Sequence, residues 1–553
     1  MNATDDNAAA ACMNAAWLMA ALESSGVKDV VISPGSRNAP ILYAVAAMEN
    51  EGRIRAHPHF DERGAAFFAL GIIRATGRPV ALVTTSGSAP AHAYPAIVEA
   101  AHAKLPIVMV SADRPFEMRQ VGASQTTRQV GMFANHIVDS LDIPASIGLS
   151  ANSRTLNGPA RAVVNRVRRL IARARGVFGA AGPVHVNIGF CDPLTPPAQF
   201  AVPALPPSPI EVRSCRAQRA WEEAVDTRLR TVIVAGADGG IDAQRAAVAA
   251  GVPLVAEPSS GVFGLPGFQP YQQAMLRRWG HEIEQAVVFG TPTLSRPVSQ
   301  LLSREDVRVV VVGQVADYAD VAGNAELVVG ALTPARTPHL AEWLAQWEDR
   351  VAQLAQFYDA QELPDGIRVA QTVWNLHAES DDLLVLGASN AIRYVDLIGA
   401  MPTAMPRVYA SRGQAGIDGT IAFSAGLARG SGKPVRALVG DLTFLHDANS
   451  LTLAHDSAVD IVVLDDGGGR IFQSLEHGEA ASPATYERFF AVGQEVDYRA
   501  LASAYGVEYV RVDPRGDHSA LDVMPDRTRI VHVPCDHTSI RTKLAALFPD
   551  NIQ

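Results

Sequence analysis

Short apolar runs recur along the chain, and each ends at glycine, serine or aspartate before a stretch with helical spacing of apolar residues. In the first third such runs lie at 29–36, 79–87, 106–115 and 183–189. Brief runs rich in valine and isoleucine are typical of buried parallel strands, and their alternation with helices predicts a doubly wound sheet. We therefore expect one α/β domain over residues 1–190.

A proline-rich segment follows this domain. Residues 192–212 carry repeated prolines, which lack the N–H group that helices and central strands need, so we expect a linker over residues 191–212. Three further apolar runs, each ending in glycine, then predict a central α/β domain over residues 213–355. A helical pattern from Ala341 to Phe357 closes that domain.

The alternating pattern then restarts and predicts a last α/β domain over residues 365–553. Its strand-like runs lie at 382–389, 406–413, 435–441, 460–466 and 528–534. The first and last domains share one style of construction, which indicates a duplicated architecture, although the sequence has no residue-level repeat. The predicted fold class is α/β, with three domains that each contain a mostly parallel sheet flanked by helices.

Charge narrows the range of partners. The 553 residues include 47 basic and 57 acidic side chains, for a net charge of −10. This balance argues against nucleic acid or an anionic membrane surface as the main partner. One arginine-rich stretch, at 161–175, has the spacing of an amphipathic helix, so we interpret its arginines as a solvated face.

The cysteines and the first segment bear on location. The cysteines are scattered without the spacing of a zinc site or a disulfide framework, which favours a reducing compartment: Cys12, Cys191, Cys215 and Cys535. The first 22 residues are acidic where a signal peptide would be basic, and they predict an amphipathic helix instead. No apolar run approaches the roughly 18 residues that span a bilayer. We expect a cytoplasmic protein without a membrane span.

Two acidic positions end neighbouring apolar runs. Asp441 follows the run at 435–440, and the Asp465–Asp466 pair follows 25 positions later, with a crossover helix expected around 442–455. Parallel strands collect ligands at their carboxyl ends, and Mg²⁺ prefers carboxylate, carbonyl and phosphate oxygens. For either acid alone, a helix N-cap or a turn is the better explanation. Together, their spacing favours a metal–diphosphate site.

A second acidic motif opens an apolar helix. In the stretch 59–71, Asp61 has the position of an N-cap, and Glu62 lies in the first turn before a run of alanine, phenylalanine and leucine. An acid at the edge of a dry interface can have a raised proton affinity. The alternative is an acid that only stabilises the helix N-terminus.

These two features together resemble the thiamine diphosphate-dependent enzymes. Where that superfamily often has Gly-Asp-Gly and later Asn-Asn, this chain has Gly-Asp-Leu and Asp-Asp. Within the superfamily the chain is similar to the synthases of menaquinone biosynthesis that act on 2-oxoglutarate and isochorismate. The similarity covers both outer domains in order, and the middle one loosely, through the segments 33–40, 59–64, 84–100, 111–115, 411–419, 440–447 and 467–472.

The resemblance implies roles for residues around the cofactor. Glu62 corresponds to the acid that hydrogen-bonds the aminopyrimidine ring and favours its activating tautomer. Ile417 corresponds to the apolar support under thiamine diphosphate, and Ser389 to a residue of the cofactor pocket. The metal, Mg²⁺ or Mn²⁺, is expected to bind the side chains of Asp441 and Asp466 and the carbonyl oxygen of Gly468.

The same resemblance implies how two dicarboxylate substrates are recognised. An arginine fork binds a carboxylate through two hydrogen bonds, which a lysine ammonium cannot do. Arg393 and Arg412 are expected to act at the catalytic centre. The positions that match the family's substrate contacts are Ser36, Arg37, Arg114, Gln125, Arg296, Arg393, Arg412, Ile471 and Phe472.

Assembly and rival functions complete the expectations. Because Glu62 and Asp441 lie on different domains, which the superfamily joins across subunits, we expect a homodimer or homotetramer with active sites at the subunit interface. One alternative is another thiamine diphosphate-dependent decarboxylase or carboligase, such as an acetolactate synthase-like enzyme. The other is a nucleotide-binding or regulatory protein that retains this fold without turnover.

Overall fold

A computed structural model describes most of the chain. The described residues are 3–145, 155–156, 158–177, 179–196, 200–210, 218–313, 318–398, 402–403, 407–538 and 540–548, with side chains from residue 10 onward. They form two compact units: the first comprises the chain up to 214 with 418–432 and 447–457, and the second comprises 215–417, 433–446 and the chain from 458 onward. Cys215 and part of the expected linker lie outside the described residues.

The first unit contains a six-stranded parallel sheet with the order β2-β1-β3-β4-β6-β5. Its strands are β1 (Asp29–Ile32), β2 (Arg55–Pro58), β3 (Val80–Thr84), β4 (Ile107–Asp113), β5 (Asp139–Ile143) and β6 (Val184–Gly189). The four predicted strands are confirmed. The remaining strands, β2 and β5, were not predicted. They form the two edges of the sheet, and their polar, partly exposed sequences lack a continuous apolar run.

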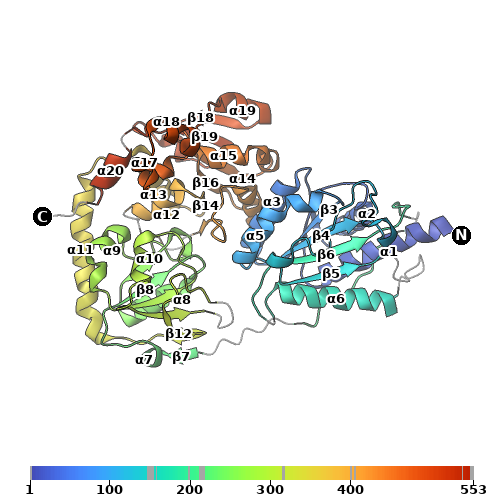
Figure 1. Ribbon diagram of the computed structural model, residues 1–553, viewed down its shortest axis with the longest axis horizontal. Coiled ribbons are helices and arrows are strands. Elements are labelled where there is room, and N and C mark those ends of the chain that lie inside the picture. Colours follow the sequence, from blue (N-terminus) through green and yellow to red (C-terminus); the bar gives the residue numbers. More distant parts are fainter. Residues whose placement is uncertain are drawn as a thin grey trace. The chain divides into compact units, whose positions relative to one another are not determined.

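Helices cover this sheet in two layers (Figure 1). One layer shares its core with the sheet and contains α1 (Ala3–Ser24), α2 (Ala39–Asn50) and α6 (Gly158–Ala174). The predicted inward face of α6 is confirmed. The expected amphipathic character of the first helix is wrong, because residues 11–22 of α1 are all buried. Contacts with α2 and α6 leave those residues no solvated face.

The second layer contains α3 (Glu62–Thr76), with α4 (Ala89–His92) and α5 (Tyr94–His102). Helix α3 also packs closely against α14 (Thr420–Ser431). Glycines allow this approach: a Cβ at Gly71 would lie 2.1 Å from the carbonyl oxygen of Phe423, and one at Gly426 would lie 2.0 Å from that of Phe68. The helix that begins at Glu62 is therefore fixed by backbone-to-backbone packing.

The second unit contains two larger parallel sheets. The middle sheet has the order β12-β11-β10-β8-β9, and the last sheet has the order β15-β14-β16-β17-β19-β18. The middle strands are β8 (Thr231–Ala235), β9 (Leu254–Ala256), β10 (Gln285–Phe289), β11 (Arg308–Val312) and β12 (Ala325–Val329), with a separate pair β7 (Gln218–Ala220) and β13 (Ala331–Thr333). The last strands are β14 (Leu383–Leu386), β15 (Val408–Tyr409), β16 (Val435–Gly440), β17 (Val459–Asp465), β18 (Glu508–Arg511) and β19 (Arg529–Pro534).

The first and last sheets have the same strand order when each is numbered along the chain: 2-1-3-4-6-5. This confirms the duplicated architecture that the sequence indicates. The eight strands predicted for the second unit are also present, although Pro406 at the start of one run lies outside the described residues. Five strands were missed, and each is short or partly polar, so none forms a long apolar run: β7, β9, β12, β13 and β18.

The principal helices of the second unit flank these sheets (Figure 1). They are α8 (Ile241–Ala250), α9 (Gln272–Trp279), α10 (Arg296–Leu302), α11 (Ala341–Asp359), α12 (Asp365–Glu379), α13 (Asn390–Leu397), α19 (Tyr498–Tyr505) and α20 (Ile540–Ala546), with the short α7 (Trp221–Ala224), α17 (His477–Ala480) and α18 (Pro483–Tyr486). Helix α11, predicted at 341–357, joins the middle sheet to the C-terminal segment. The Trp343 indole donates to the carbonyl of Thr231, and the Tyr358 hydroxyl donates to that of Leu547.

The crossover between β16 and β17 differs from the single helix expected at 442–455. It contains α15 (Asp441–His446), a 3₁₀ turn and α16 (Leu451–Ala454). The break falls at the buried Asp447, whose carboxylate accepts hydrogen bonds from the N–H groups of Ile421 and Ala422. The N–H groups in the first turn of α14 need acceptors, and Asp447 supplies one at the point where the crossover helix breaks. Across the described segments, no helix has both the length and the apolar character needed to span a membrane.

Candidate active site

Two buried carboxylates lie at one edge of the last sheet. Strands β16 and β17 are parallel neighbours in which Gly440 is opposite Leu464. Asp441 comes directly after Gly440, and Asp466 comes two residues after Leu464; these aspartates are only 3% and 8% exposed. The structure therefore brings the predicted acids to the carboxyl ends of adjacent strands, where doubly wound sheets bind their ligands.

The electrostatics of this carboxylate pair are unfavourable without a cation. Burial, and then the charge of Asp441, raise the pKa of Asp466 to about 8. Burial also raises the pKa of Asp441. Arg470, whose charge acts on both aspartates, forms its ion pair with Glu487 at 2.7 Å. Among the described residues, neither aspartate forms an ion pair, so the pair fits a divalent cation that would supply the missing positive charge.

The backbone after β17 supports the same interpretation. Gly468 has φ of 110°, and a Cβ there would lie 2.2 Å from the carbonyl oxygen of Ala491, so only glycine fits. Its N–H donates to Asp441 Oδ2 at 2.6 Å, which leaves its carbonyl oxygen as the atom predicted to bind the metal. Within the described ranges, no cluster of three His, Cys, Asp or Glu side chains could hold a metal. A metal ion bound here would therefore need backbone and ligand oxygens in addition to the two carboxylates.

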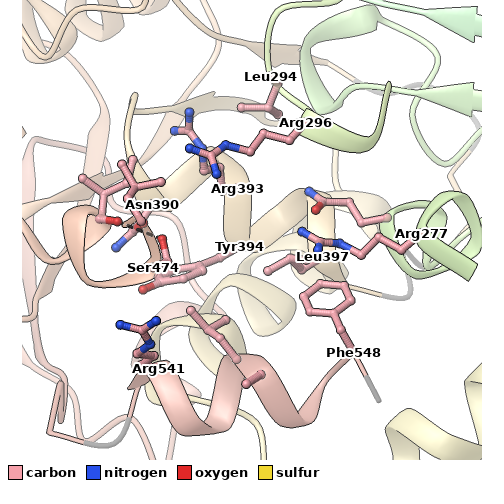
Figure 2. Close-up of a pocket in the computed structure, with 15 residues that line it drawn as sticks. Arg277, Leu294, Arg296, Asn390, Arg393, Tyr394, Leu397, Ser474, Arg541 and Phe548 are labelled. Carbon is pink, nitrogen blue, oxygen red and sulfur yellow. Dashed lines mark hydrogen bonds between the residues drawn. The ribbon is translucent and has the colours of Figure 1, made fainter. Parts of the chain in front are cut away.

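A cavity of about 430 Å³ adjoins this edge of the second unit. It brings together three residues predicted from the sequence, Arg296, Arg393 and Ile471 (Figure 2). Asn390 also lines it and hydrogen-bonds to Asp466, so the cavity is connected to the carboxylate pair. Its other lining residues are Gln273, Arg277, Leu294, Tyr394, Leu397, Ser474, Leu475, Arg541, Leu544, Ala545 and Phe548.

The cavity combines positive charge with apolar walls. Figure 2 shows the guanidinium groups of Arg296 and Arg393 on one side and Arg541 on another. Arg277 lies over the ring of Phe548, 4.4 Å from its centroid. Such a lining suits a small anion with a hydrophobic body. Phe472, predicted as part of the apolar wall, packs against His477 and Phe490 beside Ile471, although it is not itself among the residues that line this cavity.

Arg393 and Arg412 influence each other's charge, although their hydrogen bonds go to different partners. Arg393 Nη1 donates to the carbonyl of Ser389 at 2.6 Å, and Ser389 itself has φ of 69° at the start of α13. Arg412 is buried and donates from Nη2 to the carbonyl and the hydroxyl of Thr293, at 3.0 and 2.9 Å. Burial, and then the like charge of Arg412, lower the pKa of Arg393. The two guanidinium groups thus lie close enough to concentrate positive charge.

Two buried acids face these arginines from the same unit. Asp396 accepts hydrogen bonds from the amides of Gln272 and Gln273, both at 2.5 Å, and burial raises its pKa to about 6. Glu257 Oε1 accepts from the N–H of Leu294 at 2.7 Å, and burial raises the pKa of Glu257 to about 7. The middle sheet and α9 therefore contribute polar groups directly behind the arginine cluster.

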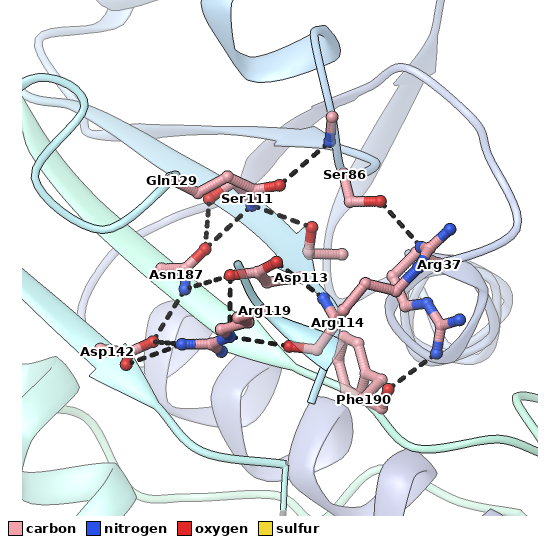
Figure 3. Close-up of polar contacts among 12 residues, drawn as sticks. Arg37, Ser86, Ser111, Asp113, Arg114, Arg119, Gln129, Asp142, Asn187 and Phe190 are labelled. Carbon is pink, nitrogen blue, oxygen red and sulfur yellow. Dashed lines mark hydrogen bonds and ion pairs between the residues drawn. The ribbon is translucent and has the colours of Figure 1, made fainter. Parts of the chain in front are cut away.

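A second pair of arginines lies in the first unit (Figure 3). Arg37 is buried and donates to the carbonyl of Phe190 at 2.8 Å, with an ion pair to Asp192 at 3.2 Å. Arg114 Nη1 donates to Ser86 Oγ at 2.8 Å. Burial, and then Arg37, lower the pKa of Arg114, which indicates that the two guanidinium groups are near neighbours. Together they form a compact cationic site.

The remaining predicted residues of the first unit lie in exposed positions. Ser36 is exposed directly before Arg37. Gln125 is exposed, and its Nε2 donates to the carbonyl of Ser86 at 3.1 Å. The structure thus links Gln125 and Arg114 through one serine. Ile417 is partly buried. It is the last residue of a stretch of the second unit, and Asp418 begins a stretch of the first unit.

Glu62 begins helix α3 as predicted. The N-cap prediction for Asp61 is confirmed: its Oδ1 accepts from the N–H groups of Arg63 and Gly64 at 3.0 and 3.3 Å. The other Asp61 oxygen accepts from Asn449 Nδ2 at 2.8 Å. Glu62 itself is partly exposed. Its backbone is held firmly while its carboxylate is accessible, as a hydrogen-bonding role toward a ligand requires.

Sequence reasoning missed several residues that the cavity brings together. Asn390 had a usable signal, since it is the polar residue directly after Ser389 at the end of β14. Arg277 and Arg541 had none, because each lies in a helix with ordinary amphipathic spacing. Gln273 likewise comes from a segment of the middle region that carries no recognisable motif, and so does Glu257, a buried acid near the arginines that is not among the lining residues.

Family comparisons agree with this geometry. Residues 14–132 match the family model described as thiamine pyrophosphate enzyme, N-terminal TPP binding domain. Residues 398–524 match thiamine pyrophosphate enzyme, C-terminal TPP binding domain. The two matches fall on the duplicated outer regions that carry Glu62 and the carboxylate pair.

Curated relatives match along most of the chain. A 2-succinyl-5-enolpyruvyl-6-hydroxy-3-cyclohexene-1-carboxylate synthase from Paenarthrobacter aurescens is 39% identical, with 94% of this chain and 93% of the relative covered. The synthase from Kineococcus radiotolerans is 40% identical over 94% and 95% of the two chains. The chain belongs to the 2-succinyl-5-enolpyruvyl-6-hydroxy-3-cyclohexene-1-carboxylate synthase family. A third synthase, from Rhodococcus erythropolis, is 36% identical over 94% and 96%.

Membership of the synthase family accounts for the three-domain α/β construction. The match to these relatives along most of the chain also includes the middle sheet, which neither of the two family models reaches. The arginine-lined cavity and the cationic site of the first unit are both compatible with the carboxylate in the name of these relatives.

Proposed function

We propose that this chain decarboxylates 2-oxoglutarate and adds the resulting succinyl carbanion equivalent to isochorismate. The products are 2-succinyl-5-enolpyruvyl-6-hydroxy-3-cyclohexene-1-carboxylate and CO₂, in menaquinone biosynthesis. The match to the named synthases along 94% of the chain carries this proposal. The arginine-lined cavity beside the buried carboxylate pair supports it, because both substrates are carboxylates.

The cofactor is thiamine diphosphate, held through Mg²⁺ or Mn²⁺. Asp441 and Asp466 would bind the cation with the carbonyl of Gly468, and Ile417 and Ser389 would contact the cofactor. Two buried, like-charged carboxylates with a glycine backbone beside them support this assignment. When bound, thiamine diphosphate supplies the electron sink for the carbanion equivalent that decarboxylation leaves.

Glu62 would hydrogen-bond the aminopyrimidine ring of the cofactor. Its place at the start of α3, next to the firmly bonded cap Asp61, supports this role, because the backbone is held while the carboxylate is accessible. Glu62 and the carboxylate pair belong to different units of the chain. We propose a homodimer or homotetramer in which active sites form between subunits.

Substrate recognition would use two groups of residues. In the second unit Arg296, Arg393 and Arg412 would bind carboxylates, with Ile471 and Phe472 as apolar contacts. In the first unit the group comprises Ser36, Arg37, Arg114 and Gln125. Bidentate binding to guanidinium groups gives selectivity for dicarboxylates over pyruvate-like acids. The domain boundaries at 190, 212, 355 and 365, and a cytoplasmic location, remain proposals from the sequence.

A substrate assay tests this function against its rivals. Purified protein with thiamine diphosphate and Mg²⁺ should release CO₂ from 2-oxoglutarate at a rate that rises strongly when isochorismate is added. Turnover of pyruvate at an equal rate would favour an acetolactate synthase-like enzyme and overturn the proposal. Absence of turnover with any 2-oxoacid, despite cofactor binding, would favour a non-enzymatic role.

A further inference from the structure

Ser86 lies two residues beyond the end of β3 and is completely buried. Its hydroxyl makes two contacts with opposite roles. Oγ accepts a hydrogen bond from Arg114 Nη1 at 2.8 Å and donates to the carbonyl of Gln125 at 3.0 Å. In return, Gln125 Nε2 donates to the Ser86 carbonyl at 3.1 Å. One small side chain therefore connects two residues assigned to substrate recognition.

Arg114 differs in its partners from a nearby structural arginine. Arg119 forms ion pairs with Asp113 and Asp142, both at 3.1 Å, and donates to the carbonyl of Arg114 at 2.8 Å. The Arg114 backbone N–H donates to Asp113 Oδ1 at 2.7 Å, but its guanidinium donates to neutral oxygens, those of the Ser86 hydroxyl and the Ser124 carbonyl. Among the described residues, no carboxylate forms an ion pair with Arg114. Asp192 and Asp113 act on its charge from a distance without an ion pair, so the guanidinium keeps hydrogen-bonding capacity for an incoming carboxylate.

The backbone around Ser86 is shaped to accept Gln125. Gln125 has φ of 54°, a left-handed conformation that costs free energy for a residue with a Cβ. A Cβ at Gly87 would lie 2.8 Å from Gln125 Cγ, so glycine leaves room for this side chain. The reciprocal bonds with Ser86 hold the strained residue in place. The same segment is tied a second time to Arg114, whose Nη2 donates to the Ser124 carbonyl at 3.3 Å.

A rigid frame stands behind this arrangement (Figure 3). The amide of Asn187 donates to Asp113 at 3.0 Å, and Gln129 Nε2 donates to Asn187 Oδ1 at 3.0 Å. Gln129 Oε1 also accepts from the N–H of Gly87 at 3.0 Å. The backbone on both sides of Ser86 and Arg114 is therefore fixed, so the serine hydroxyl is the adjustable link between them.

We propose that Ser86 is a positioning residue for substrate recognition. It orients the Arg114 guanidinium toward a substrate carboxylate and holds Gln125 beside it. This inference rests on the proposed function, in which Arg114 and Gln125 contact substrate. Ser86 itself does not touch the substrate, because its side chain is fully enclosed.

Three variants separate hydrogen bonding from packing. Ser86→Ala removes both hydroxyl contacts, and kcat/KM for the substrate bound by Arg114 should fall roughly ten- to a hundredfold, the range for losing a hydrogen bond to a charged group. Ser86→Cys nearly keeps the volume but is a weak donor and acceptor, so it should be almost as impaired. Ser424→Ala is the matched control, since this buried serine bonds only within its own helix, to Thr420. It should change kcat/KM less than about twofold.

A double-mutant cycle tests whether Ser86 acts through Arg114. In an Arg114→Ala background, Ser86→Ala should cost at most about threefold, the remainder that passes through Gln125. Losses that multiply in full would show that Ser86 acts independently, and would overturn the inference. Restoration of activity by Ser86→Cys would also overturn it, because packing would then be the cause.

A binding measurement provides a readout apart from turnover. Succinate, a dicarboxylate without the reactive 2-oxo group, should bind the enzyme loaded with cofactor and Mg²⁺ more weakly when Ser86 is alanine, while thiamine diphosphate affinity stays unchanged. Equal weakening for cofactor and succinate would indicate general disruption and contradict the inference. If the unaltered protein shows no synthase activity, the proposed function fails; if it is active and Ser86→Ala is too, only the role of Ser86 fails.

Discussion

The N–H of Gly468 donates to the carboxylate of Asp441 at 2.6 Å, although 27 residues separate the two along the chain. This contact joins the end of β16 to the glycine turn after β17. It places one carboxylate against a backbone that lacks side chains, next to a second buried carboxylate, Asp466. The charge of each aspartate disfavours the charge of the other, and a bound divalent cation would offset this repulsion.

Removing one of these charges should stabilise the protein without metal. In Asp466→Asn, repulsion from Asp441 and the cost of burying a charge both disappear, so the free energy of unfolding should rise by about 1–3 kcal/mol. The same variant should lose most of the stabilisation that Mg²⁺ plus thiamine diphosphate gives the unaltered protein. Thermal unfolding with and without both ligands measures the two effects. A variant that is less stable without metal would contradict this account of the pair.

Glu62→Gln should abolish most catalysis while the fold is kept. The amide cannot replace the carboxylate as a proton-accepting partner, so kcat should fall about 10²- to 10⁴-fold, the usual contribution of a general acid–base group. Glu222→Gln is the matched control, because Glu222 also lies in the first turn of a helix but is exposed and far from any motif. Steady-state kinetics and a melting curve for each variant decide the matter. Near-normal turnover of Glu62→Gln would rule out its proposed role.

The buried acid Glu257 should make stability depend on pH. Its folded-state pKa is raised to about 7 from an ordinary value of 4.5, so the folded protein binds the proton more tightly than the unfolded chain does. The free energy of unfolding should therefore fall as pH rises from about 4.5 to 7, by up to about 3 kcal/mol, and then level off.

The Glu257→Gln variant isolates this contribution. Denaturant unfolding across that pH range should show a difference between the variant and the unaltered protein that grows with pH. The exposed Glu305 serves as control, and Glu305→Gln should show a constant difference. A constant difference for Glu257→Gln as well would mean that this carboxyl titrates in its ordinary range.

Gly426→Ala should destabilise the protein although alanine is the better helix former. The new Cβ would lie 2.0 Å from the carbonyl oxygen of Phe68, so α3 and α14 would have to move apart. Overpacking of this kind costs about 1–3 kcal/mol. Gly313→Ala, where a Cβ meets nothing within 4 Å, is the control. Chemical denaturation compares them; equal stability of the two variants would mean that the helix contact can relax.

Much of the fold could be predicted because the sheet strands are buried on both faces. Runs such as Val80–Thr84 and Val435–Gly440 are continuous and apolar, so they stand out in the sequence. Edge strands such as Arg55–Pro58 are partly exposed and polar, and no periodicity marks them. The segmented crossover after Asp441 was also missed, because its cause, the capping of α14 by Asp447, depends on residues distant in sequence.

The candidate site was predictable where a motif ends a strand. Asp441 and Asp466 follow apolar runs, and Asp61 has the spacing of an N-cap, so local rules found them. Arg277 and Arg541 come to the cavity through helix packing, which leaves no trace in local sequence. The same holds for Ser86, whose importance lies in its contacts with Arg114 and Gln125 rather than in its neighbours along the chain.

The affinity for thiamine diphosphate, measured by titration with and without a divalent cation, tests the central claim most directly. The unaltered protein should bind the cofactor tightly only with Mg²⁺ or Mn²⁺, and Asp441→Asn should lose that dependence along with most of the affinity. Tight binding in the presence of a chelator, or an unchanged affinity in Asp441→Asn, would contradict the assignment of the carboxylate pair.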